Sequence, residues 1–160
     1  MIDMRVTRMF FDKPKVLRAV NRAKYRALSK AGGWIRKTAR FSMRRRKTSA
    51  SPGRPPSAHV GLLRDFLFYA YDPSSRSVVI GPAAMKRRRD DVPALMEWGG
   101  TRHVRRGELY KRRGSKKWAR ATKSTNLKYA PHPFMGPALR KADQAGVLPE
   151  AWRNSVKARS

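Results

Sequence analysis

The sequence predicts an α+β fold, in which helices pack on one face of a small antiparallel sheet, and three observations lead to this prediction. A long stretch near the N-terminus, residues 13–43, repeats its apolar side chains with the period of a helix. Two short runs rich in aromatic and β-branched residues lie on either side of a turn within residues 61–82. Residues 134–158 return to helical spacing after two prolines. A chain of 160 residues fits one domain, so we expect residues 1–160 to form a single unit.

Residues 13–43 form the longest predicted helix. Asp12 can cap its N-terminus, and Pro14 falls in the first turn, where proline is tolerated. Because glycine lowers helix stability by about 1 kcal/mol relative to alanine, we expect a kink or break at Gly32-Gly33. Apolar residues three, four or seven positions apart define one face, and Lys and Arg occupy the other: the apolar residues are Val16, Val20, Ala23, Ala27, Ala31, Trp34 and Phe41.

A loop and a hairpin are predicted next. Residues 42–60 contain prolines at positions 52, 55 and 56, which disfavour a helix and favour an extended path. Residues 62–71 predict a strand, and the turn signal at 72–75 separates it from a second strand at 77–80. Residues 61–82 are therefore predicted to form a β-hairpin.

The second half of the chain alternates short elements with basic segments. Within residues 92–101, a short helix begins at Pro93 and ends at Gly99-Gly100. Residues 102–129 are basic and weakly patterned, and we expect two short strands around a loop. Two helices, at about 136–144 and 149–157, complete the C-terminal segment.

Positive charge dominates the composition. Lys and Arg number 39 against 10 Asp and Glu, which gives a formal net charge of +29. Such a surface repels itself unless nucleic acid, an acidic protein or an anionic membrane neutralises it. The chain is nevertheless 40% hydrophobic, enough to build a core and more than a disordered basic tail would carry.

Several classes of protein are disfavoured by composition. The chain has no cysteine, which excludes disulfides, thiol nucleophiles and thiolate zinc sites. No run approaches the roughly 20 apolar residues that span a bilayer, and the N-terminus lacks the pattern of a signal peptide. We therefore expect no membrane partner and a product made in the cytoplasm.

No catalytic constellation is indicated. His59, His103 and His132 lie in Pro-rich or basic regions without metal-ligand spacing. Asp90-Asp91 could hold Mg²⁺ in a nuclease, but these residues follow four basic residues, and charge compensation or helix capping explains them more simply. We therefore predict a protein that is not an enzyme, with no catalytic residue, metal site or cofactor.

Three basic clusters point to phosphate groups. Lys and Arg contacts to phosphates give sequence-independent affinity that weakens with salt. No helix-turn-helix, zinc finger or ribonucleoprotein motif indicates base readout, so we expect non-specific binding to double-stranded DNA. The candidate phosphate-facing residues are Arg44, Arg45, Arg46, Lys47, Arg54, Lys86, Arg87, Arg88, Arg89, Arg105, Arg106, Arg112, Arg113, Lys116 and Lys117.

Three ordered segments resemble a known family. Residues 53–64 (GRPPSAHVGLLR) are similar to a Pro-containing loop followed by T-G-x-L-R, with Val60 where threonine is common. Residues 92–101 (VPALMEWGGT) are similar to Y-A-x-x-x-E-x-G-T, with Pro-Ala replacing Tyr-Ala and one extra glycine. Residues 130–139 (APHPFMGPAL) are similar to P-x-P-F-(M/L)-x-P-A-L. With the N-terminal helix, these segments resemble the head–tail connector, or tail-completion, proteins of long-tailed bacteriophages and prophages.

The resemblance implies a structural virion protein in the phage neck, at the head–tail junction. Its subunits would form a homo-oligomeric ring between the portal-side connector and the tail terminator, and DNA would pass through the ring. The strong basicity and the insert at 102–128 depart from the family pattern. We expect Glu97 to pair with a basic residue, either within the subunit or across its edge. Candidate subunit-interface residues are Glu97, Trp98, Thr101, Phe134, Met135 and Trp152.

Other classes remain open. A non-specific nucleic-acid-binding protein of nucleoid or ribosomal type would explain the charge but not the ordered segments at 92–101 and 130–139. Such a protein would bind duplex DNA as a monomer or dimer with steep salt dependence, whereas a connector subunit would bind weakly until assembled. A nuclease would depend on Asp90-Asp91. Another virion role, as a minor tail or capsid-associated protein, is a further alternative.

Overall fold

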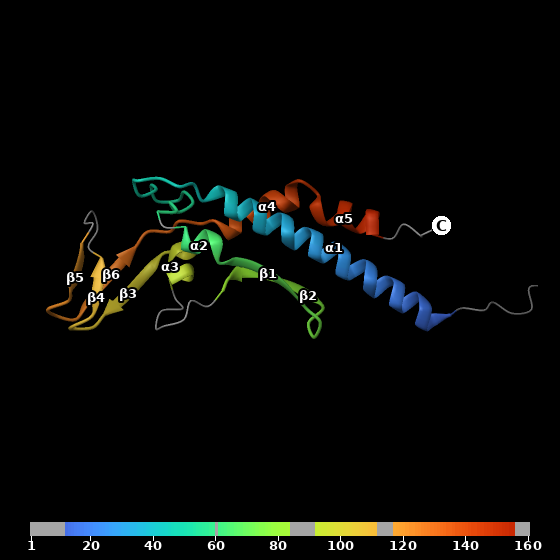
Figure 1. Cartoon of the computed structure of the whole chain (residues 1–160), viewed down its shortest axis with the longest axis horizontal. Coiled ribbons are helices and arrows are strands. Elements are labelled where there is room, and N and C mark those ends of the chain that lie inside the picture. The colour runs from blue at the N-terminus through green and yellow to red at the C-terminus, as the bar shows by residue number, and fades with distance from the viewer. Residues whose placement is uncertain (1–11, 60, 84–91, 112–116, 156–160) are drawn as a thin grey trace, which may run out of the picture.

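Helices and antiparallel strand pairs alternate along the chain, which confirms the α+β class. The computed structural model describes residues 12–59, 61–83, 92–111 and 117–155. In chain order, the elements are α1 (Lys13–Ser42), α2 (Leu62–Asp65), β1 (Leu67–Asp72), β2 (Ser77–Pro82), α3 (Val92–Trp98), β3 (Gly100–Val104), β4 (Leu109–Lys111), β5 (Trp118–Arg120), β6 (Thr125–Tyr129), α4 (Met135–Gln144) and α5 (Val147–Ser155) (Figure 1).

Helix α1 runs unbroken through Gly32 and Gly33, so the break expected there is wrong. Close approach of the hairpin explains the first glycine. A Cβ added at Gly32 would lie 2.6 Å from Cγ1 of Val78 and 3.1 Å from Cδ2 of Tyr69. At the N-terminus, Asp12 caps the helix as predicted, since its Oδ1 accepts the Lys15 N–H at 3.0 Å.

The β1–β2 hairpin lies along one side of α1. Its antiparallel register runs from Leu67 opposite Pro82 to Asp72 opposite Ser77, close to the predicted hairpin. The first four residues of the predicted strand instead form the helix α2. This turn follows Gly61, whose φ of +88° redirects the chain, and the N–H of Asp65 donates to the Gly61 carbonyl at 2.8 Å.

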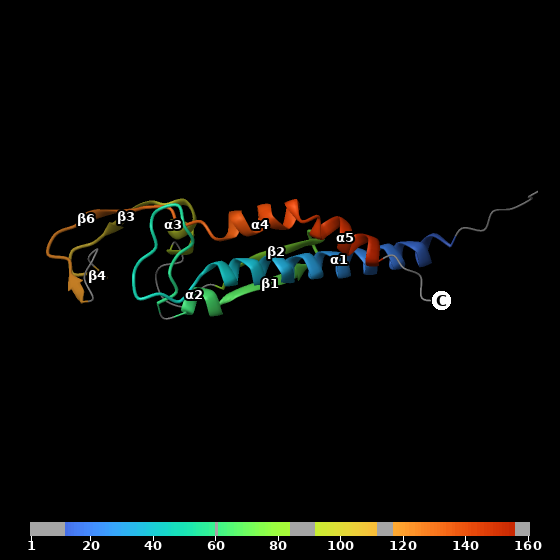
Figure 2. The ribbon, with the colours of Figure 1, turned by 90° about the horizontal axis from the view of Figure 1, so that it is seen from above.

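Residues 100–111 and 117–129 form a narrow two-stranded ribbon that projects from one end of the molecule (Figures 1 and 2). The ribbon is two strands wide but consists of two successive strand pairs, so it contains four strands where we expected two. Strand β3 pairs with β6, and β4 pairs with β5. Backbone bonds join the two pairs, from Gly107 N–H to the Ala121 carbonyl at 2.7 Å and from Ala121 N–H to the Glu108 carbonyl at 2.9 Å. We call this element the basic ribbon.

The core lies where the C-terminal half of α1 meets its neighbours. Helix α1 packs against the hairpin and also against α4 and α5, which lie along it (Figure 1). Both C-terminal helices are confirmed, although the second begins two residues earlier than predicted. The buried cluster draws on α1, β1, α4, the residue after α1 and the residue before α4, and consists of Ile35, Ala39, Met43, Leu67, Phe134, Ala138 and Ala142. Alanine predominates on the helices because the elements approach closely. Within the described residues, no helix is long and apolar enough to cross a membrane.

Candidate assembly and nucleic-acid surfaces

Glu97, at the end of α3, holds the N-terminus of α4. Its carboxylate accepts three backbone N–H groups: Phe134 at 2.8 Å, Met135 at 3.0 Å and Gly136 at 2.7 Å. These groups lack intrahelical partners, and a negative charge at a helix N-terminus is favourable. Glu97 is 9% exposed, so its charge is stabilised by these amides rather than by water.

A glycine turn and a short hydrogen bond bring the same two segments together. Gly99 has a φ of +72°, and a Cβ there would lie 2.9 Å from the Tyr129 carbonyl oxygen and 3.0 Å from Pro131. The His132 N–H donates to the Met96 carbonyl at 2.6 Å. The segments at 92–101 and 130–139, which carry the family resemblance, are therefore in direct contact.

The interface candidates divide into inner and outer residues. Glu97 and Phe134 lie inside the fold, and Phe134 is only 1% exposed. The expected pairing of Glu97 with a basic side chain is corrected: the partners that the structure gives it are backbone amides. Met135 is half-buried against the core. Thr101, Trp98 and Trp152 are exposed, and Trp98 is 79% exposed against 42% for Trp152.

The basic loop, residues 43–59, carries five of the phosphate-facing candidates on a backbone that is tied to the body. The Gly53 N–H donates to the Pro131 carbonyl at 2.8 Å, and Nδ1 of His132 lies 3.0 Å from the Arg54 carbonyl oxygen. A small hollow of about 90 Å³ lies among Arg44, Arg46 and Arg54. The candidates Arg44, Arg45, Arg46, Lys47 and Arg54 are all exposed.

The basic ribbon carries the other described candidates. Arg105 and Arg106 are exposed and line an open groove of about 1160 Å³ between α3 and β3, which Trp98 also borders. Arg102 is neutralised within the ribbon, because its Nη2 lies 2.6 Å from Oε1 of Glu108. Lys117 is also exposed. The remaining candidates lie outside the described residues: Lys86, Arg87, Arg88, Arg89, Arg112, Arg113 and Lys116.

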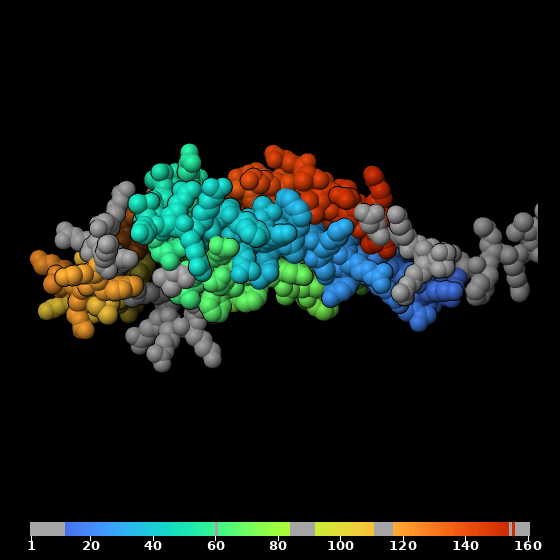
Figure 3. All heavy atoms as spheres, turned by 45° about the horizontal axis from the view of Figure 1, so that its top comes forward, coloured from blue at the N-terminus to red at the C-terminus, as the bar shows by residue number. Residues whose placement is uncertain are grey.

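An uncovered apolar surface was missed at the sequence level. Every residue from 13 to 22 is exposed, including Val16, Leu17 and Val20, which are 41%, 51% and 45% exposed. Figure 3 shows this part of α1 extending beyond the hairpin and the C-terminal helices. The sequence did contain a sign of this surface, because the apolar stripe continues through the first turns of the helix. Periodicity alone does not say how much of a stripe its own chain will cover.

The outer face of the hairpin is a second exposed apolar surface. Tyr69 and Val78 pack towards Gly32 of α1, so the alternate residues point away from the helix. Of these, Phe68 is 48% exposed and Val79 is 61% exposed. We call Phe68, Ala70 and Val79 the outer hairpin patch.

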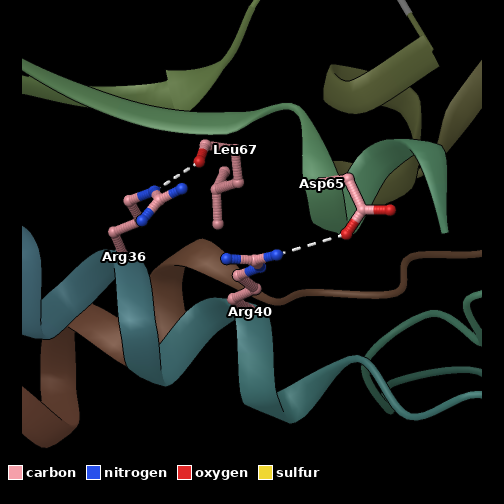
Figure 4. A network of polar contacts seen from close by, with 4 residues as sticks. All are labelled: Arg36, Arg40, Asp65 and Leu67. Atoms are coloured by element: carbon pink, nitrogen blue, oxygen red, sulfur yellow. Dashed lines mark hydrogen bonds and ion pairs between the residues drawn. The ribbon is translucent and has the colours of Figure 1, made fainter.

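Two arginines of α1 fix the hairpin in place (Figure 4). Nε of Arg36 donates to the Leu67 carbonyl at 2.5 Å, and its guanidinium lies 5.8 Å from the Phe68 ring centroid. Nη2 of Arg40 lies 3.3 Å from Oδ1 of Asp65. These contacts hold the start of β1 and the preceding helix α2 against α1.

The histidines show local hydrogen bonds rather than a shared site. Nδ1 of His103 lies 2.8 Å from Oδ1 of Asn126, His132 contacts the loop backbone, and His59 is exposed. Among the described residues, no group of three His, Cys, Asp or Glu side chains could hold a metal ion. Asp90-Asp91 lies outside the described residues.

Comparisons with known proteins found no family model, no curated protein and no solved structure that matches this chain.

Proposed function

We propose that the chain is a structural subunit of a tailed-phage neck that assembles into a closed homo-oligomeric ring through which double-stranded DNA passes. The observation that carries this proposal is the uncovered part of the α1 stripe. Val16, Leu17 and Val20 continue the apolar face that α4, α5 and the hairpin bury further along the helix. Contiguous exposed apolar surface of this kind is typical of protein interaction sites.

The two apolar surfaces favour a head-to-tail contact. The uncovered stripe and the outer hairpin patch are different in composition and lie on different elements. Packing the stripe of one subunit on the hairpin patch of the next would give a heterologous interface, which closes into a ring when the rotation between subunits allows it. The net charge of +29 opposes such assembly, so a polyanion within the ring would stabilise it.

The contact between α3 and α4 favours the hypothesis of a connector subunit over that of a free nucleic-acid-binding protein. The segments at 92–101 and 130–139 are joined through Glu97 and through the glycine turn. A basic protein that coats nucleic acid needs no such shared framework. In a ring subunit, a fixed start for α4 would hold the C-terminal helices in register for docking on adjacent neck proteins.

Native mass spectrometry of the full chain at moderate ionic strength, with and without short duplex DNA, tests the proposal. We expect a closed assembly of one stoichiometry. A variant with Val16→Ser and Val20→Ser should shift the population to monomer, because it removes apolar surface from the contact. A matched variant with Arg18→Ser and Arg22→Ser alters the same helical turns and should still assemble.

Two results would count against the ring. If the wild-type protein stays monomeric and coats DNA in proportion to DNA length, it is a packaging protein of nucleoid type. If the Val16→Ser and Val20→Ser variant assembles like the wild type, the uncovered stripe is not the contact.

A further inference from the structure

We propose that the basic ribbon is the element of each subunit that contacts DNA, by binding phosphate groups of the duplex along the polar face of β3 and β6 and at the groove beside α3. This inference rests on the proposed function, which supplies the DNA, and it identifies the surface that meets it. Neither the charge of the whole chain nor the sequence clusters distinguish the ribbon from the other basic segments.

The ribbon's charge is almost wholly uncompensated. Residues 102–128 hold eleven basic residues and one acidic residue, Glu108. That carboxylate is already engaged, since it accepts from Arg102 at 2.6 Å and from the Arg105 backbone N–H at 3.0 Å. The described basic side chains that remain exposed, without an ion pair to any described residue, are Arg105, Arg106, Arg120, Lys123 and Lys128.

The exposed face of the β3–β6 pair has the composition of a phosphate-binding surface. Strand register places Thr101 opposite Lys128 and His103 opposite Asn126, and all four side chains are exposed on the same face. These are residue types that donate hydrogen bonds to phosphates and sugars in protein–DNA complexes. No apolar side chain interrupts this face, whereas a protein interface would place apolar anchors at its centre.

The ribbon's shape also suits a duplex. It is two strands wide and projects beyond the body (Figures 1 and 2). Among its described side chains, the buried ones are Val104 and Ala121, where the two strand pairs join. The major groove of B-DNA admits a two-stranded ribbon. Where the two strand pairs join, just after β3, Arg105 and Arg106 line the open groove together with Trp98 of α3, so basic side chains of the ribbon border a groove that the body also lines.

Exposed aromatic residues make an acidic protein the competing partner. Trp98 borders the groove, and Trp118 is 65% exposed on β5. Both could anchor a partner protein. We favour DNA because the polar β3–β6 face and the uncompensated charge lie together on the ribbon.

The test compares two full-length variants with the same change in net charge. The ribbon variant carries Arg105→Glu, Arg106→Glu and Lys128→Glu, and the body variant carries Lys30→Glu, Lys37→Glu and Lys141→Glu at exposed helix positions. Binding to a short fluorescein-labelled duplex of mixed sequence is measured by anisotropy over a range of salt concentrations. We expect about tenfold or greater loss of affinity and a flatter salt dependence for the ribbon variant, and about threefold loss or less for the body variant.

Three results would overturn the inference. Equal weakening of the two variants would assign DNA binding to overall charge. Unchanged DNA binding by the ribbon variant, with lost binding to polyglutamate, would assign the ribbon to an acidic protein. A changed assembly of the ribbon variant in native mass spectrometry would place the ribbon in the subunit contact.

Two controls keep the outcomes separate. Thermal unfolding followed by circular dichroism checks that the variants fold, and a variant with Arg105→Gln, Arg106→Gln and Lys128→Gln provides a milder change at the same positions. Loss of assembly on Val16→Ser and Val20→Ser, with duplex binding per subunit retained, would show that ring contact and DNA contact are separate surfaces. If the wild-type protein never assembles, the comparison of duplex affinity between the ribbon and body variants still shows whether the ribbon contacts DNA.

Discussion

The two halves of helix α1 carry the same apolar stripe but meet different surroundings. Although Phe41 near the end of α1 is 61% exposed, the alanines of the stripe from Ala23 onward are buried by the hairpin and the C-terminal helices, and Ala39 is completely buried. Before that point, Val16 and Val20 are 41% and 45% exposed. The covered half is rich in alanine, which lets neighbouring elements approach closely, whereas the uncovered half presents larger β-branched side chains.

The difference shows that helical periodicity identifies the face to be buried but not the chain that buries it. In the part of the chain that the structure describes, the hairpin and the C-terminal helices end before the first turns of α1 (Figure 3). Burying this exposed apolar surface in the proposed contact would contribute roughly 25 cal/mol per Å². The predictions below disturb the elements that cover the second half of α1, and so test why the two halves differ.

The largest effect is expected at Glu97, because it fixes the start of α4 over the covered half. Glu97→Ala leaves three amides of Phe134, Met135 and Gly136 without their shared acceptor and should lower the free energy of unfolding by about 3 kcal/mol. Glu97→Gln keeps one acceptor oxygen and should lose about half as much. Urea denaturation followed by circular dichroism gives both values.

Glu150 provides a matched control for this experiment. It is an exposed carboxylate in the first turn of α5, so Glu150→Ala removes a similar charge at a helix N-terminus without exposing buried amides. We expect a change of about 0.5 kcal/mol or less. Equal losses at positions 97 and 150 would mean that Glu97 acts through charge alone.

Smaller changes in stability, opposite in sign to each other, are expected when the two adjacent glycines of α1 are replaced by alanine. Gly32→Ala would put a Cβ 2.6 Å from Cγ1 of the stiff Val78 side chain, so we expect a net loss of about 1 kcal/mol despite better helix propensity. At Gly33, the nearest atoms belong to Tyr69 at 3.7 Å, which is ordinary contact. Gly33→Ala should therefore stabilise the protein by about 0.5–1 kcal/mol.

Thermal unfolding of the two single variants measures this difference directly. The neighbouring substitutions have the same chemistry and lie in the same helix, so they share most other effects. Stabilisation by both would show that the hairpin yields at Val78 and does not press closely on the covered half.

Elements with a strong local signal could be predicted from the sequence. The period of α1, the turn signal before Ser77 and the glycine stop at Gly99 each specify local structure, and each predicted element is present. Residues 62–65 could not be predicted as helix, because their apolar residues are equally compatible with a strand and the turn depends on the positive φ of Gly61. The second strand pair of the basic ribbon was missed because it is short and lacks apolar alternation.

The candidate surfaces depended more on tertiary structure. The sequence identified Glu97 and Phe134 as important, but an isolated acid in a basic chain suggests an ion pair, and only the fold shows that it meets backbone amides. It identified Arg105 and Arg106 as phosphate-facing candidates, but not the ribbon that carries them. The exposure of the stripe at Val16 could not be predicted from the sequence, because it depends on where the other elements end.

The smallest effect concerns the turn of the hairpin that covers α1. The hydroxyls of Ser74 and Ser75 donate to the Asp72 carboxylate at 2.6 Å each, and with the Ser74 N–H they lower the pKa of Asp72 from 3.8 to about 2. Because the pKa is lower in the folded protein, this turn contributes its full stabilisation above about pH 4. The contribution is lost as the pH falls from about 4 to about 2.

Asp72→Asn should therefore remove a small part of the acid sensitivity while leaving the hairpin in place, since the amide oxygen can still accept from Ser74. The side-chain carboxyl shift of Asp72, followed by NMR against pH, should titrate near 2, and the loss of stability in this range should be smaller in the variant than in the wild type. A titration midpoint near 3.8 would mean that the serines do not hold the carboxylate in solution. The hairpin turn would then be looser than the face that rests on Gly32, and the cover over α1 would depend on the close packing of Val78 and Tyr69 rather than on the turn.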